Sequence, residues 1–499
     1  MSYRDQLKEE ANLTRTMNGA VTHASTGEAC LDLFAVAGGM RYRRPKEQIK
    51  LFDKAYIETP ELAMKLLFHM RDVRQGMGER KLFRTLLKHV AYTWPESARK
   101  NVAYVTEYGR WDDLLCLLNT PAHDSAVRVI RAQLDKDLAA VERRETGDLE
   151  APISLLAKWL PSENASSART RLLAQQVIRA LDMEPKAYRR MLTRLRRHIC
   201  LTERYLTRKQ LEKINYEAVP AHAMLRYRQA FERRDGESFG RFLADVSKGK
   251  KAMHADTLDP HEILRPYFKG FWGTSNAAGG ETLNRLWNSL SAELGNRNAI
   301  SVIDVSGSMY CHPQGTPMPA LISQAMGLYC AERCTGTFHN MFISFESEPH
   351  LLEIHGKTLE DKLRYIGSAP WGGSTNLEAV FDLILRTAIK HGTPQEELPS
   401  VLYIFSDMEF NQAIQNPNRT IYDNAREKFE AAGYHLPAVV FHNVNSWQMQ
   451  APVTAHTRGA ALTSGTAVAS LKERFDGNVT PMSHMLRVLN SKRYEPIHA

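Results

Sequence analysis

One stretch, Ala299-Ile-Ser-Val-Ile-Asp-Val-Ser-Gly-Ser-Met309, constrains the fold of this chain more than any other. Four of its first five residues are apolar, which is typical of a parallel strand buried on both faces. The strand ends at Asp304, and the hydroxyls of Ser306 and Ser308 follow on either side of a glycine. An oxygen-only cluster of this kind suits a hard cation such as Mg²⁺. The stretch therefore predicts a buried strand whose carboxyl end carries ligands for a divalent cation.

Two downstream segments extend this candidate site. The Gly-rich loop Trp371–Leu377 carries the Thr375 hydroxyl, and Val401–Asp407 is a second apolar strand that ends in a carboxylate. In an open α/β sheet, ligands bind outside the carboxyl ends of the strands, near the topological switch point. One site would therefore collect five residues: Asp304, Ser306, Ser308, Thr375 and Asp407. The alternative is two buried strands that end in ordinary turn residues and bind no metal.

These segments resemble a von Willebrand factor A domain, and the five residues match its metal-ion-dependent adhesion site. The resemblance implies that Ser306, Ser308 and Thr375 touch the metal directly or nearly so. It implies that Asp304 and Asp407 act mostly through water, which leaves one position for an acidic group of a partner protein. The implied cofactor is Mg²⁺, with Mn²⁺ or Ca²⁺ as substitutes. Glu409, just past Asp407, faces the same rim, either supporting the ligands or solvated.

The C-terminal part, residues 286–499, has the pattern of a doubly wound α/β domain. Apolar runs predict strands near 299–304, 338–345, 350–354, 400–406, 437–442 and 459–463. Helical periodicity predicts helices near 318–333, 377–391, 421–432 and 480–490. The sheet is expected to be mostly parallel, with a short antiparallel edge at 350–354.

The preceding residues, 1–285, have a helical pattern without a convincing strand. Thr59-Pro60 marks a helix start, and Leu62, Leu66 and Met70 then recur at helical spacing. Helices of about 12–16 residues separated by short turns predict stacked helix pairs, as in an irregular HEAT-like α-solenoid. The chain is therefore expected to have an all-α first domain at 1–285 and a second domain at 286–499.

Positive charge is concentrated in the helical part. The chain carries a formal net charge of +9, and residues 151–251 hold about 22 basic and about 10 acidic side chains, or near +12. Such an excess suggests a polyanionic partner, since arginine pairs with phosphate in two-pronged fashion. The alternative is a solvated basic helical surface. The candidate RNA-binding residues are Arg189, Arg190, Arg194, Arg196, Arg197, Arg204, Arg208, Lys209, Arg226, Arg228, Arg233, Arg234, Lys248, Lys250 and Lys251.

Composition and motifs exclude several classes of protein. Hydrophobic content of 43% and charged content of 24% are ordinary for a globular protein, and no apolar run reaches the roughly 18 residues of a membrane span. The charged start of the chain has no apolar signal-peptide core, so a cytoplasmic location is expected. The sequence has no Gly-x-x-x-x-Gly-Lys-Ser/Thr loop, His-Glu-x-x-His motif or Gly-x-Ser-x-Gly elbow. We therefore expect no enzyme, no small-molecule substrate and no membrane partner.

A helical first part followed by an A domain with Asp-x-Ser-x-Ser-Met resembles the TROVE family, to which the Ro autoantigen belongs. In that family the helical repeats bend into a ring closed by the A domain. The basic outer face binds small non-coding RNAs, and single-stranded ends of defective RNAs enter the central hole. Segments Arg71–Arg80, Glu107–Leu114, Lys158–Glu163 and Ser406–Phe410 are more similar to a separate TROVE-like group.

The resemblance implies a ribonucleoprotein component that binds small structured RNA through its basic helices and Mg²⁺ through its A domain. The alternative is a metal-dependent protein-interaction scaffold of the adhesion type that binds no RNA. A partner with an acidic residue would then dock at the metal site. The two hypotheses differ in whether chelation of the metal or removal of the basic face abolishes partner binding.

Overall fold

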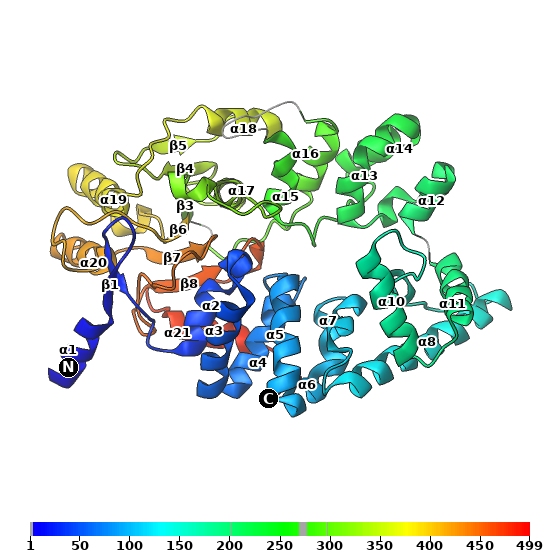
Figure 1. Ribbon diagram of the computed structural model, residues 1–499. Helices are drawn as coiled ribbons and strands as arrows, with labels where there is room; N and C mark the ends of the chain where they lie inside the picture. Colours follow the sequence, from blue (N-terminus) through cyan, green and yellow to red (C-terminus); the bar gives the residue numbers. More distant parts are fainter. Residues whose placement is uncertain (1–2, 200, 269–276, 297) are drawn as a thin grey trace. The chain divides into compact units, whose positions relative to one another are not determined.

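The computed structural model describes residues 3–199, 201–268, 277–296 and 298–499 (Figure 1). It divides into two compact units. The first, here the sheet unit, contains the residues up to Thr59, Arg74–Met77 and Tyr216–Ser491. The second, here the helical unit, contains Pro60–Val73, Gly78–Asn215 and Lys492–Ala499. These units interleave along the chain, and the division into two consecutive domains at residue 285 stays a prediction.

A mixed six-stranded sheet forms the core of the sheet unit, in the order β5-β4-β3-β6-β7-β8. All pairs are parallel except β4 with β5, which is antiparallel. Strands β3, β6, β7 and β8 are buried along their whole length, as apolar runs in a parallel sheet require. The strands are β3 (Ala299–Ile303), β4 (Met341–Ser344), β5 (Leu351–Glu353), β6 (Val401–Ser406), β7 (Ala438–Asn443) and β8 (Ala460–Ser464).

The strand order defines the switch point of this sheet. From β3 the chain goes to β4 and β5 on one side, and then crosses back to β6 on the other side of β3. The carboxyl ends of β3 and β6 therefore flank the position where ligands bind in open α/β sheets. The predicted α/β domain with a mostly parallel sheet and an antiparallel edge is confirmed.

Helices of the sheet unit accompany this sheet, and α17 packs against β3, β4 and β6. Residues before the sheet also belong here: α2 packs against β8 and α21. The early helices are α1 (Tyr3–Asn12), α2 (Ala29–Val36) and α3 (Pro45–Glu58). The middle helices are α13 (Ala221–Arg234), α14 (Gly236–Ser247), α15 (Pro260–Leu264) and α16 (Gly280–Asn288). The later helices are α17 (Pro319–Arg333), α18 (Leu359–Gly367), α19 (Leu377–His391), α20 (Ile421–Ala431) and α21 (Pro481–Leu489).

The expectation of an all-α first segment is wrong at residues 13–23. This stretch forms an antiparallel hairpin of β1 (Leu13–Arg15) and β2 (Val21–His23). Its threonines and Val21 favour extended backbone, and Asn18-Gly19 is a turn signal between them. Gly19 has a φ of 90°, which a glycine adopts without strain. The hairpin joins the sheet unit through isolated bridges to the loops that follow β6 and β7.

The helical unit consists of short and long helices joined by turns, as the sequence predicts. The C-terminal residues Lys492–Ala499 contact the first segment of this unit. Arg493 Nε donates to Asp72 Oδ2 at 2.8 Å, and the Tyr494 hydroxyl lies 2.9 Å from His69 Nδ1. The first helices are α4 (Pro60–Arg71), α5 (Arg80–Thr93), α6 (Pro95–Asn101) and α7 (Val105–Tyr108). The remaining helices are α8 (His123–Glu145), α9 (Leu156–Trp159), α10 (Ala168–Ala180), α11 (Pro185–His198) and α12 (Thr202–Arg208).

Among the described residues, every helix falls short of the combined length and apolar character that a membrane crossing demands.

Candidate metal site and candidate RNA surface

The two candidate carboxylates lie at the switch point of the sheet. Asp304 directly follows β3 and Asp407 directly follows β6, and these strands are parallel neighbours. Ser323 of α17 fastens the two strand ends together. Its hydroxyl donates to the Phe405 carbonyl at 2.8 Å and accepts from the Asp304 backbone N–H at 3.0 Å. The buried parallel pairing thus brings together two acids that are about a hundred residues apart in sequence.

Both carboxylate oxygens of Asp304 are occupied by hydrogen bonds. Oδ1 accepts from the Ser306 backbone N–H at 2.8 Å, and Oδ2 accepts from the Ser406 hydroxyl at 2.6 Å. Asp304 is fully buried. Burial raises its pKa, and the hydrogen bonds from Ser406 and Ser306 oppose that rise. Ser406 is a supporting residue that the sequence analysis did not select, although it immediately precedes Asp407.

The two serine hydroxyls of the motif are neighbours. Ser306 Oγ and Ser308 Oγ lie 3.3 Å apart. Ser308 belongs to a 3₁₀ helix, Gly307–Tyr310, that follows the Asp304–Ser306 turn. Ser306 is buried, whereas Ser308 is partly exposed, so the pair reaches from the buried acid towards solvent.

Asp407 has a carboxylate oxygen that lacks a partner. Its Oδ1 accepts from the Glu409 backbone N–H at 3.2 Å, while its Oδ2 is buried and makes no hydrogen bond to any described residue. Burial raises the pKa of Asp407 to about 7, and the nearby Asp304 carboxylate adds to the rise. The Ser308 hydroxyl and the Glu409 N–H act in the opposite direction. A buried, unsatisfied anionic oxygen beside a second carboxylate is an arrangement that a cation would stabilise.

Thr375 reaches this cluster through the segment after β6 rather than through a direct bond to the other four residues. It is buried, and its hydroxyl lies 2.7 Å from the Glu409 carbonyl and 3.0 Å from Asn411 Oδ1. Asn18 Nδ2 approaches the same hydroxyl at 3.4 Å. The structure therefore links Asp304, Ser306, Ser308 and Asp407 closely, and places Thr375 at the edge of that group.

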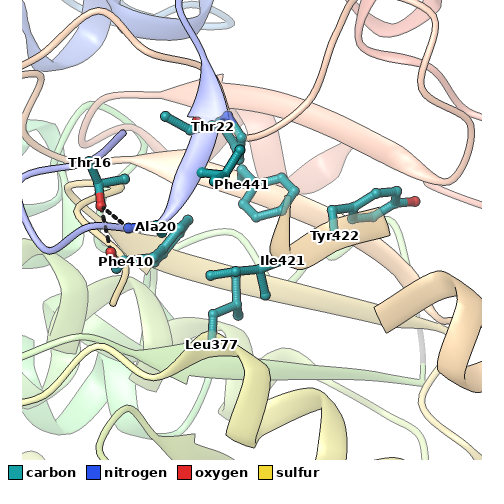
Figure 2. A pocket seen from close by; sticks show the side chains of 10 residues that line it. Thr16, Ala20, Thr22, Leu377, Phe410, Ile421, Tyr422 and Phe441 are labelled. Carbon is teal, nitrogen blue, oxygen red and sulfur yellow. Dashed lines mark hydrogen bonds between the residues drawn. The ribbon is translucent and has the colours of Figure 1, made fainter. Parts of the chain in front are cut away.

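Glu409 is buried, so the solvated alternative for this residue is wrong. Its Oε2 accepts from the Met17 backbone N–H at 2.7 Å, and its Oε1 accepts from Gln450 Nε2 at 2.9 Å. The hairpin that supplies Met17 is seated over apolar side chains (Figure 2). Thr16 bonds to Ala20 and to the Phe410 carbonyl there, and the pocket below is lined by Leu377, Phe410, Ile421, Tyr422 and Phe441. This N-terminal contribution was not predicted from the sequence.

The first group of candidate RNA-binding residues lies in the helical unit, and half of it is bound to protein groups. Arg196 donates from all three guanidinium nitrogens, to Ala157 O, Ser162 Oγ and Leu160 O at 2.7–2.8 Å. Arg204 donates to the carbonyls of residues 196 and 197 at the end of α11. Arg189 and Arg194 pair with Glu163 and Glu145.

The remaining candidates of this unit are exposed. Arg190, Arg197, Arg208 and Lys209 have no hydrogen bond or ion pair from their side chains to described residues. Lys186, one turn before Arg190, is exposed in the same way and was not selected from the sequence. Lys186, Arg190 and Arg197 share one helical face, and we call them the α11 stripe.

The second group belongs to the sheet unit and lies on α13 and in the turn that follows α14. Arg228 is partly buried and donates to Ala278 O at 3.0 Å and to Leu225 O at 2.6 Å. Arg233 donates to Gln229 O within its own helix, and Lys251 lies 3.9 Å from Asp245. The exposed side chains without such contacts to described residues are Arg226, Arg234, Lys248 and Lys250.

Comparisons with known proteins assign the chain to a family of unknown function. Residues 16–132 and 122–298 match the model described as domain of unknown function DUF2828, and residues 298–491 match domain of unknown function DUF7788. The chain belongs to the DUF2828 family. It is 31% identical to uncharacterized protein L728 of Acanthamoeba polyphaga mimivirus over 98% of this chain and 89% of that protein.

A solved structure, that of the Deinococcus radiodurans Ro (RSR) protein, is similar with a TM-score of 0.47 and 16% sequence identity. It covers 94% of this chain and 100% of that protein.

Proposed function

We propose that this protein binds RNA through its helical unit and a divalent cation, Mg²⁺ in the cell, through its sheet unit. In this proposal it acts in the cytoplasm as a component of a ribonucleoprotein and not as a catalyst. The finer fold assignment, a HEAT-like solenoid with a von Willebrand factor A type domain, belongs to the same proposal. It is supported by the motif resemblance and by the strand order, which brings Asp304 and Asp407 to the same edge of the sheet.

The observation that carries RNA binding is the α11 stripe. Lys186, Arg190 and Arg197 present three cationic groups on one exposed face, and these groups are not neutralised by described acidic side chains. At 1.5 Å rise per residue, they are spaced along about 16 Å of helix. Contacts of this kind hold a phosphate backbone with little sequence preference and are weakened by salt, because binding releases counterions.

A charge-reversal experiment tests the stripe. The double variant Arg190→Glu, Arg197→Glu is compared with Arg386→Glu, Lys390→Glu, which makes the same charge change on exposed positions of α19. The probe is an RNA hairpin with a single-stranded 3′ extension, titrated at several salt concentrations. The stripe variant should lose affinity, and its dependence on log salt should flatten by about 1.4, or roughly 0.7 per lost contact. Equal RNA affinity and equal salt dependence of the two double variants would refute RNA binding by the α11 stripe.

The cation part rests on the fit between the residues and a hard metal ion. Ser306 Oγ, Ser308 Oγ and the unpartnered Asp407 Oδ2 supply oxygen atoms only, which is the donor set that Mg²⁺ prefers. Within the described residues, no cluster of three or more His, Cys, Asp or Glu side chains offers a rival metal site. A bound cation would supply positive charge next to two buried carboxylates, and Thr375 would complete the site from the edge.

Thermal unfolding with and without metal tests this part. The wild-type chain should melt at a higher temperature in millimolar Mg²⁺ or Mn²⁺, because a ligand that binds only the folded state stabilises it. The double variant Asp304→Ala, Ser306→Ala should lose the whole metal-dependent shift. Ser491→Ala, a change outside the site, is the control and should keep it. An equal shift in the double variant would contradict the metal assignment.

A second candidate function is metal-dependent docking of a partner protein that carries an acidic residue. It is favoured by the partial exposure of Ser308, since the other four motif residues are buried and the site therefore meets solvent on this side. A chelator should then release a protein partner while RNA binding by the α11 stripe persists. Pull-down with and without EDTA, after nuclease treatment, separates the two activities.

A further inference from the structure

The loop of the N-terminal hairpin docks directly on the segment that follows Asp407. The Thr16 hydroxyl donates to the Phe410 carbonyl at 2.6 Å (Figure 2). The Gln412 backbone N–H donates to the Asn18 carbonyl at 3.1 Å, and Gly19 forms a bridge with Asn411. Because backbone groups of both segments take part, the loop is held in one register against residues 409–412.

Asn18 extends this docking into the candidate metal site. Its side-chain Nδ2 donates to the Glu409 carbonyl at 2.7 Å and approaches the Thr375 hydroxyl at 3.4 Å. The Thr375 hydroxyl has a single hydrogen, which it donates either to that carbonyl or to Asn411 Oδ1. A donor from Asn18 on one lone pair fixes the hydroxyl's orientation and leaves its other lone pair for a ligand.

Glu409 adds a second link between the hairpin and the site. Its buried carboxylate accepts from the Met17 backbone N–H, and its own N–H donates to Asp407 Oδ1. Met408, between the two acids, has a φ of 67°, a left-handed conformation that a non-glycine residue adopts at some cost. The hairpin therefore clamps the backbone turn that carries Asp407.

We infer that Asn18 is a positioning residue of the candidate metal site and that hairpin β1–β2 is an integral part of that site. The inference rests on the metal site of the proposed function. Metal binding and docking of the hairpin are then linked equilibria, because each stabilises the arrangement that the other needs. Residues that orient ligands through hydrogen bonds commonly change metal affinity about 10- to 100-fold when removed.

The test compares Asn18→Ala with Met17→Ala in the full chain. Met17 is a matched control, because its side chain is 75% exposed and only its backbone N–H is used in the clamp. The probe is Mn²⁺ alone, with free Mn²⁺ measured by electron paramagnetic resonance. Asn18→Ala should weaken Mn²⁺ binding about 10- to 100-fold and lower the melting temperature of the metal-free chain only slightly, through the lost hydrogen bond to Glu409. Met17→Ala should bind as wild type does.

A second measurement on the wild-type chain needs no substitution. Amide hydrogen exchange of residues 16–23 should slow when Mn²⁺ is added, and the slowing should vanish in Asp304→Ala, Ser306→Ala. Unchanged exchange, or Mn²⁺ affinity in Asn18→Ala equal to that of Met17→Ala, overturns the inference while the metal site stands. Absence of Mn²⁺ binding to the wild-type chain overturns both the metal site and the inference.

Discussion

The switch point of the sheet and the basic helices α11–α12 were both predicted from sequence as binding sites. The sequence determines the positions of their side chains to very different degrees. At the switch point, Asp304 and Asp407 come from distant segments and still meet, because parallel pairing of β3 with β6 fixes where each strand ends. On the basic helices, the selected arginines are close in sequence, yet Arg196 and Arg204 are consumed by backbone carbonyls. The topology of the sheet determines where a motif at a strand end lies. A cluster of charged residues in the sequence identifies a binding surface only once the hydrogen-bond or ion-pair partner of each side chain is known.

The largest effect separates a structural arginine from an exposed one on the same helix. Arg196→Ala removes three donors and leaves the carbonyls of Ala157 and Leu160 without them. It should destabilise the chain by about 3 kcal/mol, since hydrogen bonds from charged groups contribute about 1.5–3 kcal/mol each and are only partly additive. Arg190→Ala should stay within about 0.5 kcal/mol. Urea unfolding measures both, and equal losses would remove the distinction drawn between these arginines.

A pH-dependent effect of intermediate size concerns the interior of the sheet. His442 in β7 is fully buried, and desolvation lowers its pKa to about 4. Its folded-state pKa lies below the unfolded value of about 6.5, so protonation favours unfolding. The contribution of neutral His442 to the free energy of unfolding is therefore present above about pH 6.5 and is lost as the pH falls towards 4.

The variant His442→Gln isolates that contribution. Between pH 7.5 and 4.5 the wild-type chain should lose about 2 kcal/mol more stability than the variant. His69 of the helical unit, whose pKa burial also lowers to about 4, offers the matching variant His69→Gln. Parallel pH profiles of wild type and both variants would show that these histidines are not the titrating groups.

The smallest effect sharpens the difference between paired and unpaired arginines. Arg189 is held by Glu163 at 2.5 Å, with half of its side chain exposed. Glu163→Ala should free this guanidinium and strengthen RNA binding by up to about fivefold, in line with the ~0–1 kcal/mol of an exposed pair. Glu184→Ala makes the same charge change at an exposed residue and should have less effect. Equal gains would assign the change to overall charge alone.

Most of the strand and helix pattern of residues 299–490 was predictable, because the buried strands are largely apolar and polar residues follow them. Helix α18 (Leu359–Gly367) was not predicted. Hairpin β1–β2 was not predicted, although Asn18-Gly19 signals a turn, because each strand has only three residues. Its stability comes from tertiary contacts with residues after β6 and β7. The contribution of Asn18 to the site was invisible for the same reason: its partners lie more than 350 residues away.

Ser406 and Glu409 show a finer limit. Both stand beside Asp407 in the sequence, but their roles depend on which neighbour they reach. Ser406 donates to Asp304 on the adjacent strand, and Glu409 turns to the hairpin. Sequence spacing identifies which residues can gather at a strand end, and the strand order and loop contacts decide what each one bonds to.

The most direct test of RNA binding is purification of the full chain from its native cells at low salt, followed by the 260/280 nm absorbance ratio and sequencing of bound nucleic acid. We expect a discrete structured RNA that is released at high salt and is absent from the Arg190→Glu, Arg197→Glu variant. A wild-type chain that purifies free of nucleic acid at low salt would contradict it and would favour the metal-dependent docking function.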